Sequence, residues 1–319
     1  MSQMVSVIIP VKNVEDEIIP CLTAIFNQTI QPIEVLVIDG HSTDKTIENA
    51  KKFPVKILFE EFGTPAGARQ VGLLNAKGDY IAFTDSDCIP YTDWLENLLK
   101  EFRDNVVGVG GGTIYHSEEL WKRSIYFALN TFLGSATSVQ DRVFKNKRVV
   151  KSISGCNSMY KKQILLKIGG FNTELEKQIG RISEDAEINN RIQKLGLLIY
   201  TPNALVIHNH DTDLKGFARR MFYWGYVRVN NKLFDIQIVP PIIATITLIS
   251  IIISIRFFLI MIIIYLLTIL LFTLKILFQQ RDIRLLFTIP IIYIVEHTAY
   301  TCGFWRGILN FILPKRIIS

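Results

Sequence analysis

Cysteine is scarce in this sequence and is not spaced for metal binding or for disulfide chemistry. The 319 residues contain four cysteines, and no two of them form a zinc or thiol–disulfide motif. They are Cys21, Cys88, Cys156 and Cys302. We therefore expect reduced thiols in a cytosolic environment. A secretory signal is also missing, because the apolar stretch 5–11 is too short and lacks a basic leader and a small-residue cleavage site.

The glycine loop that cradles phosphates in many nucleotide-binding enzymes is missing too. No Gly-x-x-x-x-Gly-Lys spacing occurs, and the segment 10–13 after the first apolar run is a poor substitute. This disfavours a nucleotidyltransferase, which stays an alternative. The net charge of +6, from 35 basic and 29 acidic residues, is modest and suits a membrane surface as well as a nucleic acid. We expect a membrane and no nucleic acid among the partners.

Charge is almost absent from residues 236–274, where Arg256 is the only charged side chain. The stretches 240–255 and 257–274 are each close to the ~20 residues that cross a bilayer, so they predict a helical hairpin. Residues 285–313 could form a third span, or a re-entrant or interfacial pair of segments. Length favours three spans, although Lys315 and Arg316 favour a cytosolic C-terminus, which fits two.

The flanks of these apolar stretches predict the topology. Residues 217–228 mix aromatic and basic side chains, as cytoplasmic interfaces do, and basic residues flank the connection near residue 280. We therefore predict a multi-pass protein of the cell membrane with its catalytic domain in the cytoplasm. The predicted parts are a catalytic domain at 1–215, an interfacial segment at 216–235 and a transmembrane region at 236–319.

The first two hundred residues alternate short apolar runs with amphipathic stretches. Residues 5–11, 34–39, 55–59 and 80–83 are typical of buried strands, and helical spacing separates them. This alternation predicts an α/β fold with a mostly parallel sheet covered on both faces. Ligands in such folds bind at the carboxyl ends of the strands.

Two aspartates, Asp85 and Asp87, follow the strand predicted at 80–83. Strand alternation would direct both carboxylates to one side of the sheet and Ser86 to the other. Carboxylates this close repel each other unless a cation lies between them, and Mg²⁺ or Mn²⁺ is the natural guest. The alternative is a turn or helix-capping role. A capping box at 93–96, opening a helix over 94–103, argues against that alternative.

Other polar residues stand at or near predicted strand ends. Asp39 could accept a hydrogen bond from a ribose or a base, or could equally be a turn aspartate before Gly40. Arg69, in a stretch rich in small residues, could pair with a phosphate or be a solvated surface residue. His208 and His210 could supply a further metal ligand, although strand-end histidines are more often packed or hydrogen-bonded.

Acidic residues also open the helix predicted after residue 183. Asp185, next to Glu184, lies in the first turn and is placed to take a proton from a hydroxyl nucleophile. The alternative is that these acids only complement the helix dipole.

Together these motifs resemble the family 2 glycosyltransferases, which are inverting enzymes of the GT-A (Rossmann-like) fold. The resemblance covers about residues 3–210, and its matching segments are 5–11, 37–44, 68–72, 78–83, 85–87, 169–171 and 184–185. It implies that Asp39 binds the base or ribose, that Asp85 and Asp87 hold the metal, and that Asp185 is the catalytic base beside Glu184. It also implies that the donor and sugar pocket is formed in part by Pro10, Arg69, Ser86 and Asn157.

The resemblance implies transfer of one sugar from a UDP- or GDP-sugar to a lipid-linked, polyprenyl-type or glycan acceptor in cell-surface glycan or glycoprotein assembly. Gly40 stands where many members carry a second aspartate, so the donor nucleotide stays open. The Gln-x-x-Arg-Trp motif of processive polysaccharide synthases is absent, which favours single addition and leaves a synthase as an alternative. A catalytically silent membrane scaffold is a further alternative.

Overall fold

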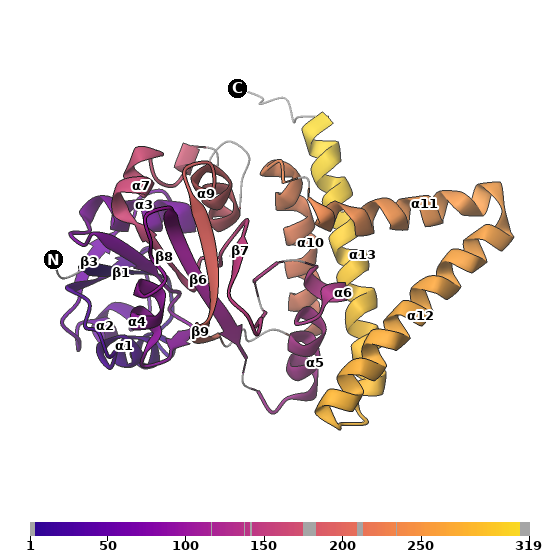
Figure 1. The fold of residues 1–319 in the computed structure, drawn as a ribbon, viewed down its shortest axis with the longest axis horizontal. Coiled ribbons are helices and arrows are strands. Elements are labelled where there is room, and N and C mark those ends of the chain that lie inside the picture. Colours follow the sequence, from indigo (N-terminus) through magenta and orange to yellow (C-terminus); the bar gives the residue numbers. More distant parts are fainter. Residues whose placement is uncertain are drawn as a thin grey trace. The chain divides into compact units, whose positions relative to one another are not determined.

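The computed structural model describes residues 4–312 except 116, 137, 141, 175–182, 209–212 and 234. The chain divides into two compact units (Figure 1). We call Met1–His116 with Val139–His210 the sheet unit, and Ser117–Ser138 with Asp211–Ser319 the helical unit. The segment 117–138 therefore groups with the C-terminal helices, although the predicted catalytic domain includes it. The predicted three-part division stays a prediction.

The described part of the sheet unit contains one nine-stranded sheet, in the order β3-β2-β1-β4-β8-β6-β9-β5, with β7 paired to β9. Its strands are β1 Val5–Val11, β2 Glu34–Asp39, β3 Lys56–Phe59, β4 Tyr80–Phe83, β5 Cys88–Pro90, β6 Val106–Ile114, β7 Arg148–Val150, β8 Ser158–Lys161 and β9 Leu197–His208. The first four strands are parallel, whereas β8 runs antiparallel to both β4 and β6. The predicted α/β sheet is confirmed, and beyond β4 it is mixed.

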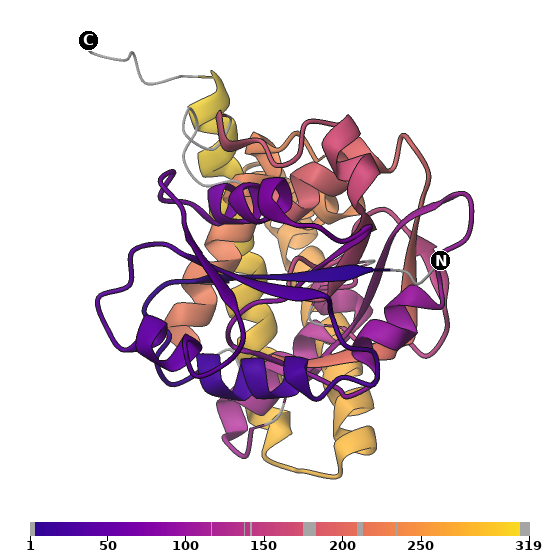
Figure 2. The same ribbon diagram turned by 90° about the vertical axis from the view of Figure 1, so that its left-hand side faces the viewer.

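Helices cover both faces of this sheet because its strands are apolar on both sides (Figure 2). One face packs against α1 Ile18–Phe26, α2 Thr46–Ala50 and α4 Trp94–Leu99. The other face packs against α3 Pro65–Asn75, α7 Lys162–Lys167 and α9 Glu184–Ile192. Within β1, Val7 and Ile9 face the first group and Ile8 faces the second, as strand alternation requires.

The helical unit contains three segments that are long and apolar enough to cross a membrane: Ile236–Ile253, Ile255–Gln280 and Leu285–Asn310. Its helices are α5 Leu120–Leu129, α6 Phe132–Ser135, α10 Leu214–Asn230, α11 Val239–Ile253, α12 Ile255–Gln280 and α13 Leu285–Ile312. The break between α11 and α12 falls at Ser254, whose hydroxyl accepts a hydrogen bond from the Phe257 N–H. These segments indicate a membrane protein, and the predicted cytoplasmic orientation stays a prediction.

Candidate active site

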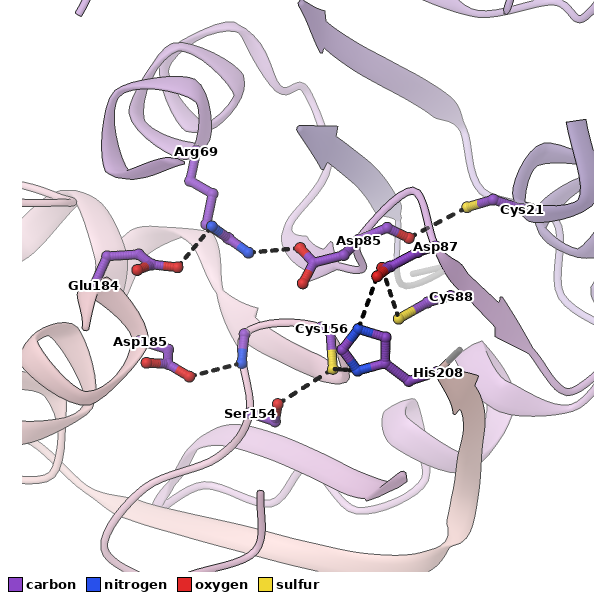
Figure 3. Close-up of polar contacts among 11 residues, drawn as sticks. Cys21, Arg69, Asp85, Asp87, Cys88, Ser154, Cys156, Glu184, Asp185 and His208 are labelled. Atoms are coloured by element: carbon purple, nitrogen blue, oxygen red, sulfur yellow. Dashed lines mark hydrogen bonds and ion pairs between the residues drawn. The ribbon is translucent and has the colours of Figure 1, made fainter. Parts of the chain in front are cut away.

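The two aspartates after β4 lie in a tight turn and not on a strand. The chain leaves the sheet after Phe83, and the Cys88 N–H then donates to the Asp85 carbonyl oxygen at 3.1 Å as β5 begins. Strand alternation is therefore the wrong reason for the two carboxylates to share a side. Their expected closeness is nevertheless found, because one oxygen of Asp85, one of Asp87 and a ring nitrogen of His208 lie within 4.8 Å of one another (Figure 3). Ser86, between the two acids, is buried.

The predicted capping box at the start of α4 is wrong. Asp93 is the residue before the helix, but its side chain makes no capping hydrogen bond, and Glu96 instead pairs with Lys100 and accepts from Thr29. The helix also ends at Leu99, earlier than expected. Asp93 therefore gives no reason to exclude a turn or capping role for Asp85 and Asp87. Their role follows from the residues that surround them.

His208 reaches Asp87 because β5 and β9 pair antiparallel, with Cys88 opposite His208. Its Nε2 lies 3.1 Å from Asp87 Oδ2, and the imidazole is buried. Burial alone would lower the pKa of His208, but the neighbouring Cys156 sulfur and the Asp87 carboxylate raise it well above its usual range. The prediction for His210 falls outside the described residues.

Arg69 connects the two acidic motifs. It comes from α3, whose first turn is fixed by Pro65 and by the Thr64 hydroxyl, which accepts from the Gly67 N–H. The buried guanidinium donates to Asp85 Oδ1 at 2.7 Å and to Glu184 Oε1 at 2.8 Å. A solvated surface position for Arg69 is therefore excluded, and its predicted contact with a phosphate stays a prediction.

The two acids paired with Arg69 feel opposing influences. Burial raises the pKa of Asp85 and that of Glu184, whereas the Arg69 charge lowers both. About a third of each Asp85 and Asp87 side chain, 34%, remains exposed, so a ligand can reach these carboxylates. Arg69 thus holds Asp85 and Glu184 at one accessible centre.

Asp185 is fixed beside this centre by backbone and side-chain donors. Its Oδ2 accepts from the Gly155 N–H at 3.2 Å, and its Oδ1 accepts from the Ala186 N–H at 2.7 Å and from the Ser183 hydroxyl. A Cβ on Gly155 would lie 3.3 Å from both an Arg69 nitrogen and the Asp185 Cβ, so this position suits glycine. Gly155 was missed as a site residue, because its close neighbours come from distant elements.

Two residues predicted to bind the donor lie at the carboxyl ends of β1 and β2. Asp39 is buried, and its carboxylate accepts from the Ser42 N–H and, at 2.6 Å, from the Ser42 hydroxyl, which is the turn role considered as the alternative. Pro10 is half-buried and pairs in register with Ile38. Their contacts with a nucleotide stay predictions.

Asn157 is fully buried and uses its whole amide within the protein. Its Oδ1 accepts from the Trp94 indole at 2.8 Å, and its Nδ2 donates to the carbonyl oxygens of Gly112 and Ala204. It therefore ties α4 to β6 and β9. Its predicted place in the sugar pocket stays a prediction.

Comparison with known proteins gives this arrangement a context. The glycosyl transferase family 2 profile matches residues 6–169, just over half of the chain. A Methanococcus voltae protein named dolichyl N-acetyl-alpha-D-glucosaminyl phosphate 3-beta-D-2,3-diacetamido-2,3-dideoxy-beta-D-glucuronosyltransferase is 27% identical over 330 residues, covering 96% of this chain and 97% of that protein.

Two solved structures share the fold over most of this chain. The mannosyltransferase PcManGT of Pyrobaculum calidifontis, in complex with GDP-Man and Mn²⁺, aligns with a TM-score of 0.54 at 21% identity over 72% of this chain. GalNAc-T7 with UDP, GalNAc and Mn²⁺ aligns with a TM-score of 0.53 at 15% identity, also over 72%. The chain spans 64% and 51% of these two proteins. The likeness confirms the predicted GT-A fold.

Proposed function

Because this chain belongs to glycosyl transferase family 2, we propose that it is a metal-dependent, inverting glycosyltransferase that adds one sugar to a lipid-linked acceptor. The observation that carries this proposal is the Arg69 bridge. One guanidinium contacts Asp85 of the candidate metal site and Glu184 of the acidic pair that contains the candidate base. Donor activation and acceptor deprotonation would therefore take place at one centre.

The residues present fit a divalent cation. Asp85, Asp87 and His208 together offer two carboxylate oxygens and an imidazole nitrogen within 4.8 Å of one another. Mg²⁺ prefers an all-oxygen octahedral shell, so the nitrogen favours Mn²⁺. When bound, such a cation supplies positive charge to the diphosphate leaving group of the donor. The proposed donor is a UDP- or GDP-sugar.

Asp185 is the proposed catalytic base. Glu184 is engaged by Arg69, whereas hydrogen bonds from Gly155 and Ala186 orient the Asp185 carboxylate. Asp185 would take the proton from an acceptor hydroxyl as that oxygen attacks the anomeric carbon on the face opposite the leaving group. A single displacement of this kind inverts the anomeric configuration. A phosphate acceptor would need no strong base.

The acceptor class is proposed from the helical unit and from the Methanococcus relative. Three segments are long and apolar enough to span a membrane, and the relative's name contains a dolichyl-linked sugar phosphate. A polyprenyl-type lipid acceptor would diffuse in the same bilayer that holds the enzyme, which restricts the search to two dimensions and orients the acceptor. We place the enzyme in the cell membrane with the sheet unit in the cytoplasm, where nucleotide sugars would reach it.

The proposal is tested by metal-dependent nucleotide binding in the full-length protein in detergent. UDP or GDP together with Mn²⁺ should raise the unfolding temperature, whereas neither nucleotide should do so after chelation of the metal. Asp87→Asn should abolish the shift. Asp79→Asn is the matched control, because Asp79 lies exposed just before the other end of β4.

Turnover then identifies the reaction. With the matching nucleotide sugar and a polyprenyl-linked sugar acceptor, a nucleoside diphosphate should be released and the product should have the inverted anomeric configuration. Release of pyrophosphate would indicate a nucleotidyltransferase and contradict the proposal. So would a wild-type protein that binds neither nucleotide with any divalent metal.

A further inference from the structure

Two buried thiols lie beside His208: Cys156 contacts Nδ1, the ring nitrogen that does not face Asp87, and the Cys88 sulfur lies 3.8 Å from Asp87 Oδ1. Cys88 follows Asp87 directly and pairs with His208 across β5 and β9, and Cys156 lies in the loop before β8. The two sulfur atoms and a ring nitrogen of His208 lie within 4.8 Å of one another, and all three residues are buried. Cys156 Sγ is 3.7 Å from Nδ1, whereas Nε2 is 3.1 Å from Asp87 (Figure 3).

We propose that Cys88, Cys156 and His208 Nδ1 form a second metal site, which takes a thiophilic cation such as Zn²⁺. Two thiolates and one imidazole are a common zinc ligand set that leaves a fourth position open. Zinc bond lengths in a tetrahedral site place sulfur and nitrogen ligands about 3.6 Å apart and two sulfurs about 3.8 Å apart. The 3.7 Å between Cys156 Sγ and His208 Nδ1 matches this spacing. The two thiol protons would pass to solvent as the metal binds.

Asp87 provides the outer support that such a site needs. Histidines that bind zinc through one ring nitrogen usually donate the other N–H to a carboxylate, which fixes the ring and makes it a stronger ligand. Here Nε2 faces Asp87 Oδ2 at 3.1 Å while Nδ1 faces the sulfur of Cys156. The imidazole is therefore oriented for metal binding on its thiol side by a residue of the candidate Mn²⁺ site.

The two metal sites share the imidazole of His208, so binding of a metal at one site should weaken binding at the other. This expected antagonism rests on the proposed function. A cation on Nδ1 keeps the proton on Nε2, where it is donated to Asp87. His208 then cannot give its Nε2 lone pair to a cation held by Asp85 and Asp87. Occupation of the thiol site should therefore weaken Mn²⁺ binding, and a thiophilic metal should inhibit the enzyme without competing for the nucleotide.

Co²⁺ is the probe for the thiol site, because thiolate ligands give it a near-ultraviolet charge-transfer band that oxygen and nitrogen ligands do not. The full-length protein, reduced with a phosphine in detergent, should show a stoichiometric band that Zn²⁺ abolishes by displacement. Cys88→Ser and Cys156→Ser should each remove it. Cys302→Ser is the matched control and should retain the band, because Cys302 is exposed and lies in α13.

Two results would overturn the site, and the first needs only the wild-type protein. A folded protein that shows no thiolate band with Co²⁺, or a band that persists when both buried cysteines are serine, contradicts it. Antagonism is measured separately by Mn²⁺ titration. Prior Zn²⁺ should weaken Mn²⁺ binding roughly 10-fold or more, because loss of even an outer-shell partner of a metal ligand costs about 10- to 100-fold in affinity. Unchanged Mn²⁺ binding beside an intact band would refute the shared imidazole. An intact band in a protein without sugar transfer would instead refute the proposed function and leave the thiol site standing.

Discussion

The two units bury their apolar side chains to different extents. In the sheet unit, residues such as Val7, Ile8 and Ile9 are completely buried between the sheet and its covering helices. In the helical unit, only 11% of the most apolar window of α12 is buried within the protein. The helical unit also has a buried apolar cluster, which includes Phe217, Ile289 and Tyr293, but most of the apolar surface of α12 faces outward and suits lipid.

This difference changes what holds each unit together. Lipid solvates apolar helices as well as another helix does, so contacts among membrane-spanning helices depend on close packing, on small residues and on hydroxyl groups. A Cβ on Gly303 of α13 would lie 1.8 Å from the Phe222 carbonyl oxygen of α10, and Ser124 of α5 hydrogen-bonds to Thr288 of α13 at 2.6 Å. The sheet unit can bury the Arg69 charge at its site because Asp85 and Glu184 pair with the guanidinium. Substitutions at the site in the sheet unit should therefore affect the reaction, whereas substitutions in the helical unit should affect only the packing of its helices.

The largest effect is expected from replacing Asp185, and it should be confined to the rate of the chemical step. If Asp185 is the base, Asp185→Asn should lower transfer to a hydroxyl acceptor about 10²- to 10⁴-fold. Mn²⁺-dependent nucleotide binding should be retained, because Asp185 is not among the proposed metal ligands. Glu187→Gln is the control, since Glu187 lies on the same helix but pairs with Arg191. Wild-type transfer by Asp185→Asn with a hydroxyl acceptor would remove Asp185 from the mechanism.

Replacement of Arg69 should affect both stability and activity. Arg69→Gln leaves Asp85 and Glu184 without their cation, and removal of one partner from a buried ion pair costs about 3–5 kcal/mol of unfolding free energy. Lys100→Gln, which breaks the exposed pair with Glu96, should cost at most about 1 kcal/mol. Thermal unfolding of both variants measures the contrast. Equal, small losses would show that Arg69 is not the link between the two acidic motifs.

The strand and helix pattern of the sheet unit could be predicted because each element carries its own period. The strands at 5–11 and 34–39 have the bounds expected from their apolar runs. Short-range chemistry was less predictable: Asp93 does not cap α4, and Asp85 and Asp87 meet through a turn. In both cases the local sequence was compatible with more than one conformation, so the pattern alone did not decide between them.

Contacts across the sheet could not be predicted from one sequence. Arg69 meets Asp85 and Glu184, and Cys88 meets Cys156 and His208, only because distant segments fold to one edge. The grouping of 117–138 with the C-terminal helices was equally hidden, since its contacts lie some 160 residues away. Periodicity reports which face of an element is buried, but it does not report which element covers that face.

In the helical unit, Gly303→Ala should disturb packing without changing nucleotide binding. The added Cβ would collide with backbone of α10, which cannot move aside as a flexible side chain can. Overpacking of this kind costs about 1–3 kcal/mol, so the detergent-solubilised protein should unfold at a lower temperature. Cys302→Ala, at the exposed neighbouring position, is the control. A variant as stable as the wild type would mean that α10 and α13 do not depend on this close approach.

The smallest effect is expected from the hydrogen bond between Ser124 and Thr288. Both side chains are buried, and their oxygens lie 2.6 Å apart between α5 and α13. A double-mutant cycle with Ser124→Ala and Thr288→Val should give a coupling of about 0.5–1.5 kcal/mol, because each hydroxyl can find another partner in the unfolded helices. Ser124 already has one, since it donates to the Leu120 carbonyl oxygen of its own helix at 2.7 Å. A coupling near zero would mean that apolar packing alone holds α5 against α13. Close backbone approach at glycines such as Gly303 would then be the remaining difference in how the two units are held together.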